Sequence, residues 1–83
     1  MNAVPPSADL HGASAGEAKL VYMANQIAKF FASQPHDSAV SDIETHIRKF
    51  WDPRMRAKIL AVIAADGEGL DPLAREAIAR LAT

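Results

Sequence analysis

Apolar residues recur along this chain with the spacing of α-helices. The first stripe consists of Leu20, Met23, Ala24, Ile27 and Phe31. Residues three and four positions apart share one helical face, so this stripe predicts a helix over residues 16–33, with Phe30 widening its apolar side. Pro35 ends it, because the residue before a proline avoids helical backbone angles. Three further stripes predict helices over residues 37 or 38 to 50, 53–65 and 72–81.

Two Asp-Pro pairs mark helix starts. Asp52-Pro53 and Asp71-Pro72 each combine a good N-cap with a proline at the first helical position. The first helix has a candidate capping box, formed by Ser14 and Glu17.

The sequence leaves the first residue of the second helix undecided. It begins at Asp37 or Ser38, or one turn later, where Ser41 and Glu44 repeat the capping spacing. Glu44 and Arg48 are also expected to form an i, i+4 ion pair.

No segment shows the alternating pattern of a strand. The predicted fold class is therefore all-α: a small bundle of four short helices with a flexible N-terminal tail. Residues 1–15 are rich in Pro, Ser, Gly and Ala, and we expect them to be disordered. Residues 16–83 form one helical domain.

The composition of the chain excludes several classes of function. The chain has 83 residues, 49% of them hydrophobic, a net charge of −1 and no Cys, which excludes disulfides, thiolate metal sites and a Cys nucleophile. No apolar run approaches the roughly 20 residues of a membrane span. The N-terminus lacks the charge and apolar core of a secretory signal, so we expect a cytoplasmic protein.

The charge is unevenly distributed. Six basic side chains fall between positions 46 and 58, against the single acid Asp52: His46, Arg48, Lys49, Arg54, Arg56 and Lys58. This cluster is either a surface for an acidic or phosphate-bearing partner or the solvated side of two consecutive helices.

Two aromatic residues lie inside the basic cluster. Phe50 is expected in the core. Trp51 is either an interface residue, since Trp and Arg are enriched at binding hot spots, or a core residue at the corner. Met55 belongs to the same corner and is counted among the candidate partner-binding residues.

Polar amides interrupt the first helix. Asn25 and Gln26 follow Met23 and are either its solvent side or hydrogen-bond anchors for a partner, and methionine surfaces adapt well to partners.

No catalytic, cofactor or metal site is expected in this chain. His46 and Asp42 are helical neighbours, but two ligands do not make a site. The last helix offers only Arg75 and Arg80 for a recognition helix, so we expect no nucleic-acid binding.

Two strings carry a family resemblance. LVYMANQIAKFF (residues 20–31) and IETHIRKFWDPRMRAKIL (residues 43–60) resemble the small delta subunit of soluble NAD-dependent formate dehydrogenases. The resemblance covers residues 19–64, and KFWDPRMR (residues 49–56) is its most specific part.

The resemblance implies a hetero-oligomeric complex. Its large catalytic subunit would hold a molybdenum or tungsten cofactor and iron–sulfur clusters, and other subunits would carry FMN and bind NAD. The delta subunit would be a non-catalytic accessory that assists maturation, cofactor insertion or stability of the large subunit.

The resemblance also suggests a docking surface. We expect Arg48, Lys49, Trp51, Arg54 and Arg56 to dock on the large subunit or on its pyrophosphate cofactor. The alternative is a small helical adaptor or regulator unrelated to formate oxidation.

Overall fold

Four helices make up the part of the chain that the computed structural model describes, residues 13–82. They are α1 (Ala13–Phe31), α2 (His36–Phe50), α3 (Pro53–Ala65) and α4 (Pro72–Leu81). Within this range there is no strand, which confirms the predicted all-α class. The bounds of α3 and α4 agree with the predicted ones.

The N-terminal boundary differs from its prediction. Residues 1–12 of the expected tail lie outside the described residues, whereas residues 13–15 already belong to α1. Ser14 therefore lies within the helix and not at its cap. The helix also ends at Phe31, two residues before the predicted end.

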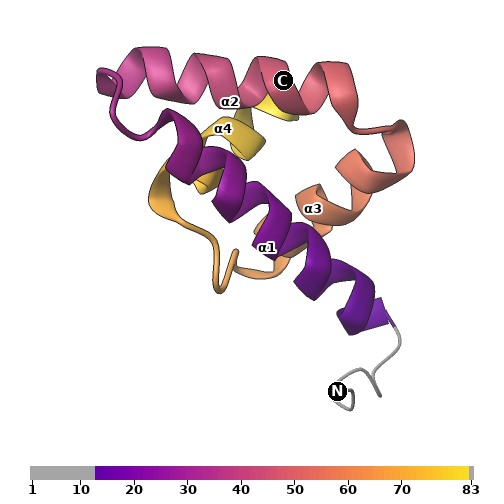
Figure 1. Ribbon diagram of the computed structural model, residues 1–83. Helices are drawn as coiled ribbons and strands as arrows, with labels where there is room; N and C mark the ends of the chain where they lie inside the picture. The colour runs from indigo at the N-terminus through magenta and orange to yellow at the C-terminus, as the bar shows by residue number, and fades with distance from the viewer. Residues whose placement is uncertain (1–12, 83) are drawn as a thin grey trace, which may run out of the picture.

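The helices pack around one another without layers. In Figure 1, α1 runs diagonally across the front, α2 lies along the top, and α3 and α4 lie behind α1. The most extensive contact joins α2 and α4, and α1 contacts all three other helices. A two-residue connection between Phe50 and Pro53 makes the sharp corner between α2 and α3.

The core lies where the four helices meet. Its buried members are Leu20, Ala24, Ala28, Val40, Ile43, Ile47, Trp51, Ile59, Ala74, Ala77 and Ile78. Helices α1 and α4 contribute mainly alanines, which let helices approach closely, while α2 contributes large β-branched side chains. Burying each isoleucine stabilises the fold by roughly 2 kcal/mol, so a few large side chains dominate the stability.

Side-chain caps fix the starts of α3 and α4. The Asp52 carboxylate accepts a hydrogen bond from the Met55 N–H at 2.9 Å, and the Asp71 carboxylate accepts one from the Leu73 N–H at 3.0 Å. Both predicted caps are confirmed. Helix α2 begins differently, because it has no side-chain cap and follows Pro35 directly. Its predicted starts at Asp37, Ser38 or Ser41 are all too late.

The connection between α3 and α4 is a tight loop that uses left-handed backbone. Gly67 has a φ of 71° and Gly69 a φ of 87°, values that L side chains rarely adopt. The Gly67 N–H donates to the Val62 carbonyl at 2.7 Å, which ends α3. The Arg75 guanidinium reaches back from α4 to the Asp66 carbonyl and packs over Gly67.

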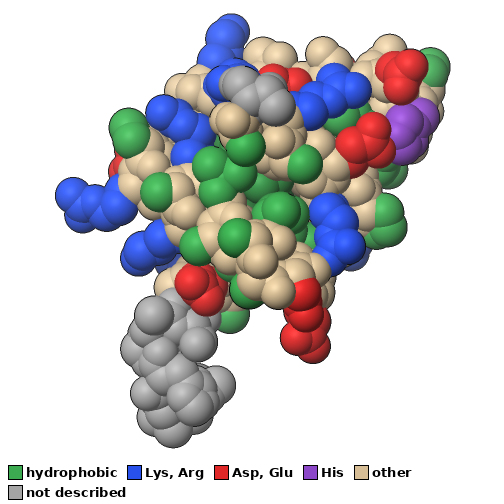
Figure 2. All heavy atoms as spheres, turned by 180° about the vertical axis from the view of Figure 1, so that it is seen from behind, with side chains coloured by type: hydrophobic (Ala, Val, Ile, Leu, Met, Phe, Trp, Pro, Cys, Tyr) green, Lys and Arg blue, Asp and Glu red, His purple; other side chains and the backbone are tan. Residues whose placement is uncertain are grey.

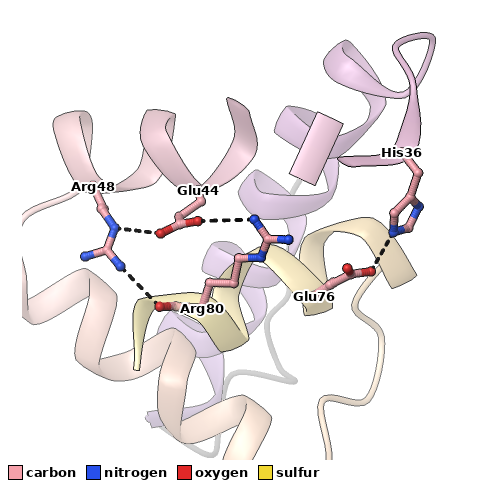
Figure 3. Close-up of polar contacts among 5 residues, drawn as sticks. All are labelled: His36, Glu44, Arg48, Glu76 and Arg80. Atoms are coloured by element: carbon pink, nitrogen blue, oxygen red, sulfur yellow. Dashed lines mark hydrogen bonds and ion pairs between the residues drawn. The ribbon is translucent and has the colours of Figure 1, made fainter. Parts of the chain in front are cut away.

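Polar contacts join α2 to α4 across their exposed edge. Figure 3 shows Glu44 between two arginines, with its carboxylate 3.0 Å from Arg48 and 3.8 Å from Arg80. The predicted Glu44–Arg48 pair is thus confirmed. Arg48 also donates to the Arg80 carbonyl at 3.1 Å, and His36 lies 2.8 Å from Glu76. These contacts hold α2 against α4 at both ends of α2.

Candidate docking surface

The α2–α3 corner separates its two adjacent aromatic residues. The backbone of Trp51 is extended, with φ −93° and ψ 136°, while its N–H still donates to the Ile47 carbonyl. Its side chain is buried in the core and only 4% exposed, whereas Phe50 is 70% exposed. The prediction that Phe50 belongs to the core is wrong. Trp51 takes that place, so it offers little surface for direct contact with a partner.

Two arginines of the basic cluster brace the corner itself. Arg56 donates to the Arg48 carbonyl at 3.3 Å and also to the Trp51 carbonyl. Arg48 is engaged with Glu44 and α4, as described above. The carbonyl groups of Arg48 and Trp51 therefore both have a hydrogen-bond partner within the chain. Arg48 and Arg56 therefore serve mainly to stabilise the corner and not to contact a partner.

The three remaining Lys and Arg side chains of the cluster face solvent. Lys49, Arg54 and Lys58 are exposed and make no hydrogen bond or ion pair with any described residue. Figure 2 views the molecule from behind, so that α3, which lies on the right in Figure 1, is on the left. Lys and Arg side chains gather along this left edge. These three charges form the part of the predicted cluster that remains available to a partner.

Asn25 has a role inside the chain. Its amide N–H₂ donates to the Gly69 carbonyl at 2.9 Å, and its amide oxygen accepts from the Asp71 N–H at 2.8 Å. The side chain thus ties α1 to the loop before α4. This internal role was not predicted, and the role of Asn25 as an anchor for a partner stays a prediction. Gln26 beside it is exposed, and Met23 is half-buried against the core.

Aromatic side chains gather where α1 and α2 meet. Phe31 packs edge-on against Phe30, with ring centroids 5.0 Å apart, and lies 6.4 Å from the His46 ring. His46 in turn lies 4.8 Å from Phe50. A cavity of about 310 Å³ opens here, lined by Gln26, Ile27, Phe30, Phe31 and His46. Its lining is almost entirely apolar.

Sequence reasoning missed the exposure of this cluster. Phe30 is 78% exposed and Tyr22 is 64% exposed, although Phe30 was expected to widen the buried side of α1. The signal was present in the sequence. Phe30 follows Tyr22 and Gln26 at four-residue intervals, which places it beside polar residues and away from Ala24 and Ala28.

A second cavity opens near the start of α1. It has a volume of about 150 Å³ and is lined by Gly16, Leu20, Asp52, Arg54, Met55 and Lys58. Met55 is half-buried here and packs against the core. We call the two cavities, together with Met23 between them along α1, the α1 groove. It brings the predicted residues Met23, Gln26, Arg54 and Met55 to one side of α1.

A third cavity has acidic side chains in its lining. It has a volume of about 430 Å³ and lies between the start of α1 and the end of α3, with Glu17, Asp66 and Glu68 in its lining. The molecule is thus electrically polarised around α1. Among the described residues, no group of three or more His, Asp or Glu side chains is placed to hold a metal ion. No described helix is long and apolar enough to cross a membrane.

The comparison with protein families decides the chain's relationship. Residues 19–78 match the family described as the NADH-dependent formate dehydrogenase delta subunit. The chain belongs to this family. No curated protein and no solved structure matches it.

The match extends the resemblance seen in the two sequence strings. It covers most of the described chain, from Lys19 in α1 to Ile78, the last buried residue of α4. As a formate dehydrogenase delta subunit, the chain forms part of a hetero-oligomer with other subunits of that enzyme. The alternative of an adaptor unrelated to formate oxidation does not fit this match.

Proposed function

We propose that this delta subunit is a non-catalytic accessory that docks on the large catalytic subunit of a cytoplasmic formate dehydrogenase. It assists maturation, cofactor insertion or stability of that subunit. The complex reduces NAD⁺ and carries a molybdenum or tungsten cofactor, iron–sulfur clusters and FMN on its other subunits. The observation that carries the proposal is the family match together with large aromatic side chains left exposed on a small domain.

The structure changes how such docking would work. The initial docking hypothesis placed Trp51, Arg54 and Arg56 together on the partner or its pyrophosphate cofactor. Trp51 is buried, and Arg56 is hydrogen-bonded within the corner. The charges that support docking are therefore those of Lys49, Arg54 and Lys58. Exposed basic side chains of this kind steer an acidic surface into place and raise the rate of association.

The proposal is tested by removing the subunit. The formate dehydrogenase subunits are expressed with and without this chain, and the metal per large subunit, complex assembly and formate-dependent NAD⁺ reduction are measured. Without the chain we expect less metal or less assembled complex. Equal metal content, assembly and activity would contradict the proposed role, and formate oxidation by the isolated chain would contradict its non-catalytic status.

A variant separates docking charge from folding. Lys49→Ala with Arg54→Ala removes two exposed charges that have no partner among the described residues, so the fold should persist. The matched control is Lys19→Ala with Lys29→Ala, which removes two exposed lysines from α1. Weaker assembly in the first variant alone supports docking through the corner.

A further inference from the structure

One side of α1 is apolar and is only partly covered by the other described helices. Gly16, Leu20, Met23, Ile27 and Phe30 are spaced by alternating intervals of four and three residues. This is the spacing of a seam that packs against another helix. Leu20 is buried, but Met23 and Ile27 are only half-buried and Phe30 is mostly exposed. The seam thus emerges from the core toward the C-terminal end of α1.

Helix α2 supplies the opposite wall at the aromatic end of the groove. His46 lines the cavity there, and Phe50, one helical turn further along α2, lies beside it with the two rings tilted and their centroids 4.8 Å apart. Phe50 is 70% exposed and Phe30 is 78% exposed. The cavity of about 310 Å³ that Phe30 and His46 line is large enough for one or two aliphatic side chains of a partner.

Helix α3 supplies the charge at the other end. Arg54 and Lys58 line the smaller cavity, and the one acid in that lining is Asp52. The Asp52 carboxylate is already engaged as the cap of α3, where it accepts from a backbone N–H at 2.9 Å. The groove is therefore apolar and aromatic at one end and basic at the other.

We propose that the α1 groove binds an amphipathic helix of another formate dehydrogenase subunit. That helix carries aliphatic side chains three and four residues apart, which fill the aromatic end, and Asp or Glu side chains that meet Arg54 and Lys58. Laying an amphipathic helix in a groove is a common recognition mode, read by anchors at this same spacing. The inference rests on the proposed function, because it takes the partner from the same complex.

Charge favours such a partner over a second copy of this chain. A two-fold dimer joins the same surface patch of both copies. In such a dimer Arg54 and Lys58 would face either the same two residues or the aromatic end of the other copy, and in neither case would an unengaged carboxylate of the groove lining meet them. Like charges in contact oppose association, whereas an acidic helix removes the repulsion.

The experiment uses the full chain, tagged and co-expressed with the other formate dehydrogenase subunits. The aromatic variant is Phe30→Ser with Phe50→Ser, and its matched control is Tyr22→Ser, an exposed aromatic on α1 outside both cavities. Circular dichroism checks that each variant is folded. We expect recovery of the complex to fall by ~10-fold or more for the aromatic variant, as for hot-spot truncations, and to stay unchanged for the control.

A charge variant tests the basic end. Arg54→Glu with Lys58→Glu should weaken binding and reverse its dependence on salt, because salt then screens a repulsion where it screened an attraction. The control Lys29→Glu should leave both the binding and its salt dependence unchanged. A photo-crosslinking residue placed at position 50 identifies the occupant by mass spectrometry. We expect the crosslink to fall in an acidic amphipathic helix of another subunit.

The outcomes separate this inference from the proposed function. Normal recovery of both groove variants, while deletion of the chain still lowers metal content or assembly, would overturn the groove and leave the accessory role standing. A crosslink to a second copy, or to residues 1–12 of the same chain, would also overturn it. If deletion of the chain changes nothing, the accessory role itself fails.

Discussion

Asn25 is expected to be a structural residue whose loss destabilises the whole domain. It makes two hydrogen bonds, to the Gly69 carbonyl at 2.9 Å and from the Asp71 N–H at 2.8 Å, and these join α1 to the start of α4. Asn25→Ala removes both, at about 1 kcal/mol each. The better helix propensity of alanine returns about 0.5 kcal/mol, which leaves a net loss of about 1.5 kcal/mol.

That loss is readily measured in a domain of this size. Because 1 kcal/mol corresponds to about 4–8 °C, the Tm in a thermal melt should fall by about 6–12 °C. The matched control is Gln26→Ala, which alters the adjacent exposed amide and should leave the Tm unchanged or slightly raised. Asn25→Asp should lose at least as much as Asn25→Ala, because it keeps the acceptor for the Asp71 N–H but places a carboxylate oxygen against the Gly69 carbonyl oxygen. Equal melting temperatures for Asn25→Ala and Gln26→Ala would refute this account of Asn25.

Three further pairs of substitutions test the fold. Gly67→Ala should lower the free energy of unfolding by ~1–2 kcal/mol in urea titrations, because at a φ of 71° its Cβ would lie 2.5 Å from a guanidinium nitrogen of Arg75. Gly69→Ala should lower it less, because the atom nearest to its Cβ is 3.6 Å away, and equal losses would contradict the clash at Gly67. By the same titration, Trp51→Ala should lower the free energy of unfolding by ~3–5 kcal/mol and Phe50→Ala by less than ~0.5 kcal/mol. A larger loss for Phe50→Ala would contradict the assignment of Trp51 to the core and Phe50 to the surface. Asp52→Ala should cost ~1 kcal/mol through loss of the α3 cap, whereas Asp52→Asn should retain most of the stability.

Features set by neighbouring residues were predictable from the sequence. The Asp-Pro pairs gave the starts of α3 and α4, because an N-cap and the proline after it act within one turn. The Glu44–Arg48 pair is local in the same way. The start of α2 was predicted less well, since its first turn follows Pro35 without a side-chain cap to mark it.

Features that depend on distant segments were not predictable. The partners of Asn25 are 44 and 46 residues away, and nothing near Asn25 in the sequence indicates them. Phe50 and Trp51 are adjacent, so periodicity alone did not decide which of them enters the core. The extended backbone at Trp51 decided it, because it continues the Ile43–Ile47 side of α2 into the core.

The exposed aromatic residues explain why binding to a larger subunit would benefit this fold. A domain of this size buries only about 60% of the surface of its unfolded chain and is marginally stable. Phe30 and Phe50 contribute little to that burial, yet covering a Phe side chain stabilises by roughly 1.5–3 kcal/mol. A partner that covers both binds the folded chain in preference to the unfolded one and shifts the folding equilibrium in the same direction. The bound delta subunit should therefore be more stable than the isolated chain, and the aromatic variant should lose this gain while keeping the stability of the free domain.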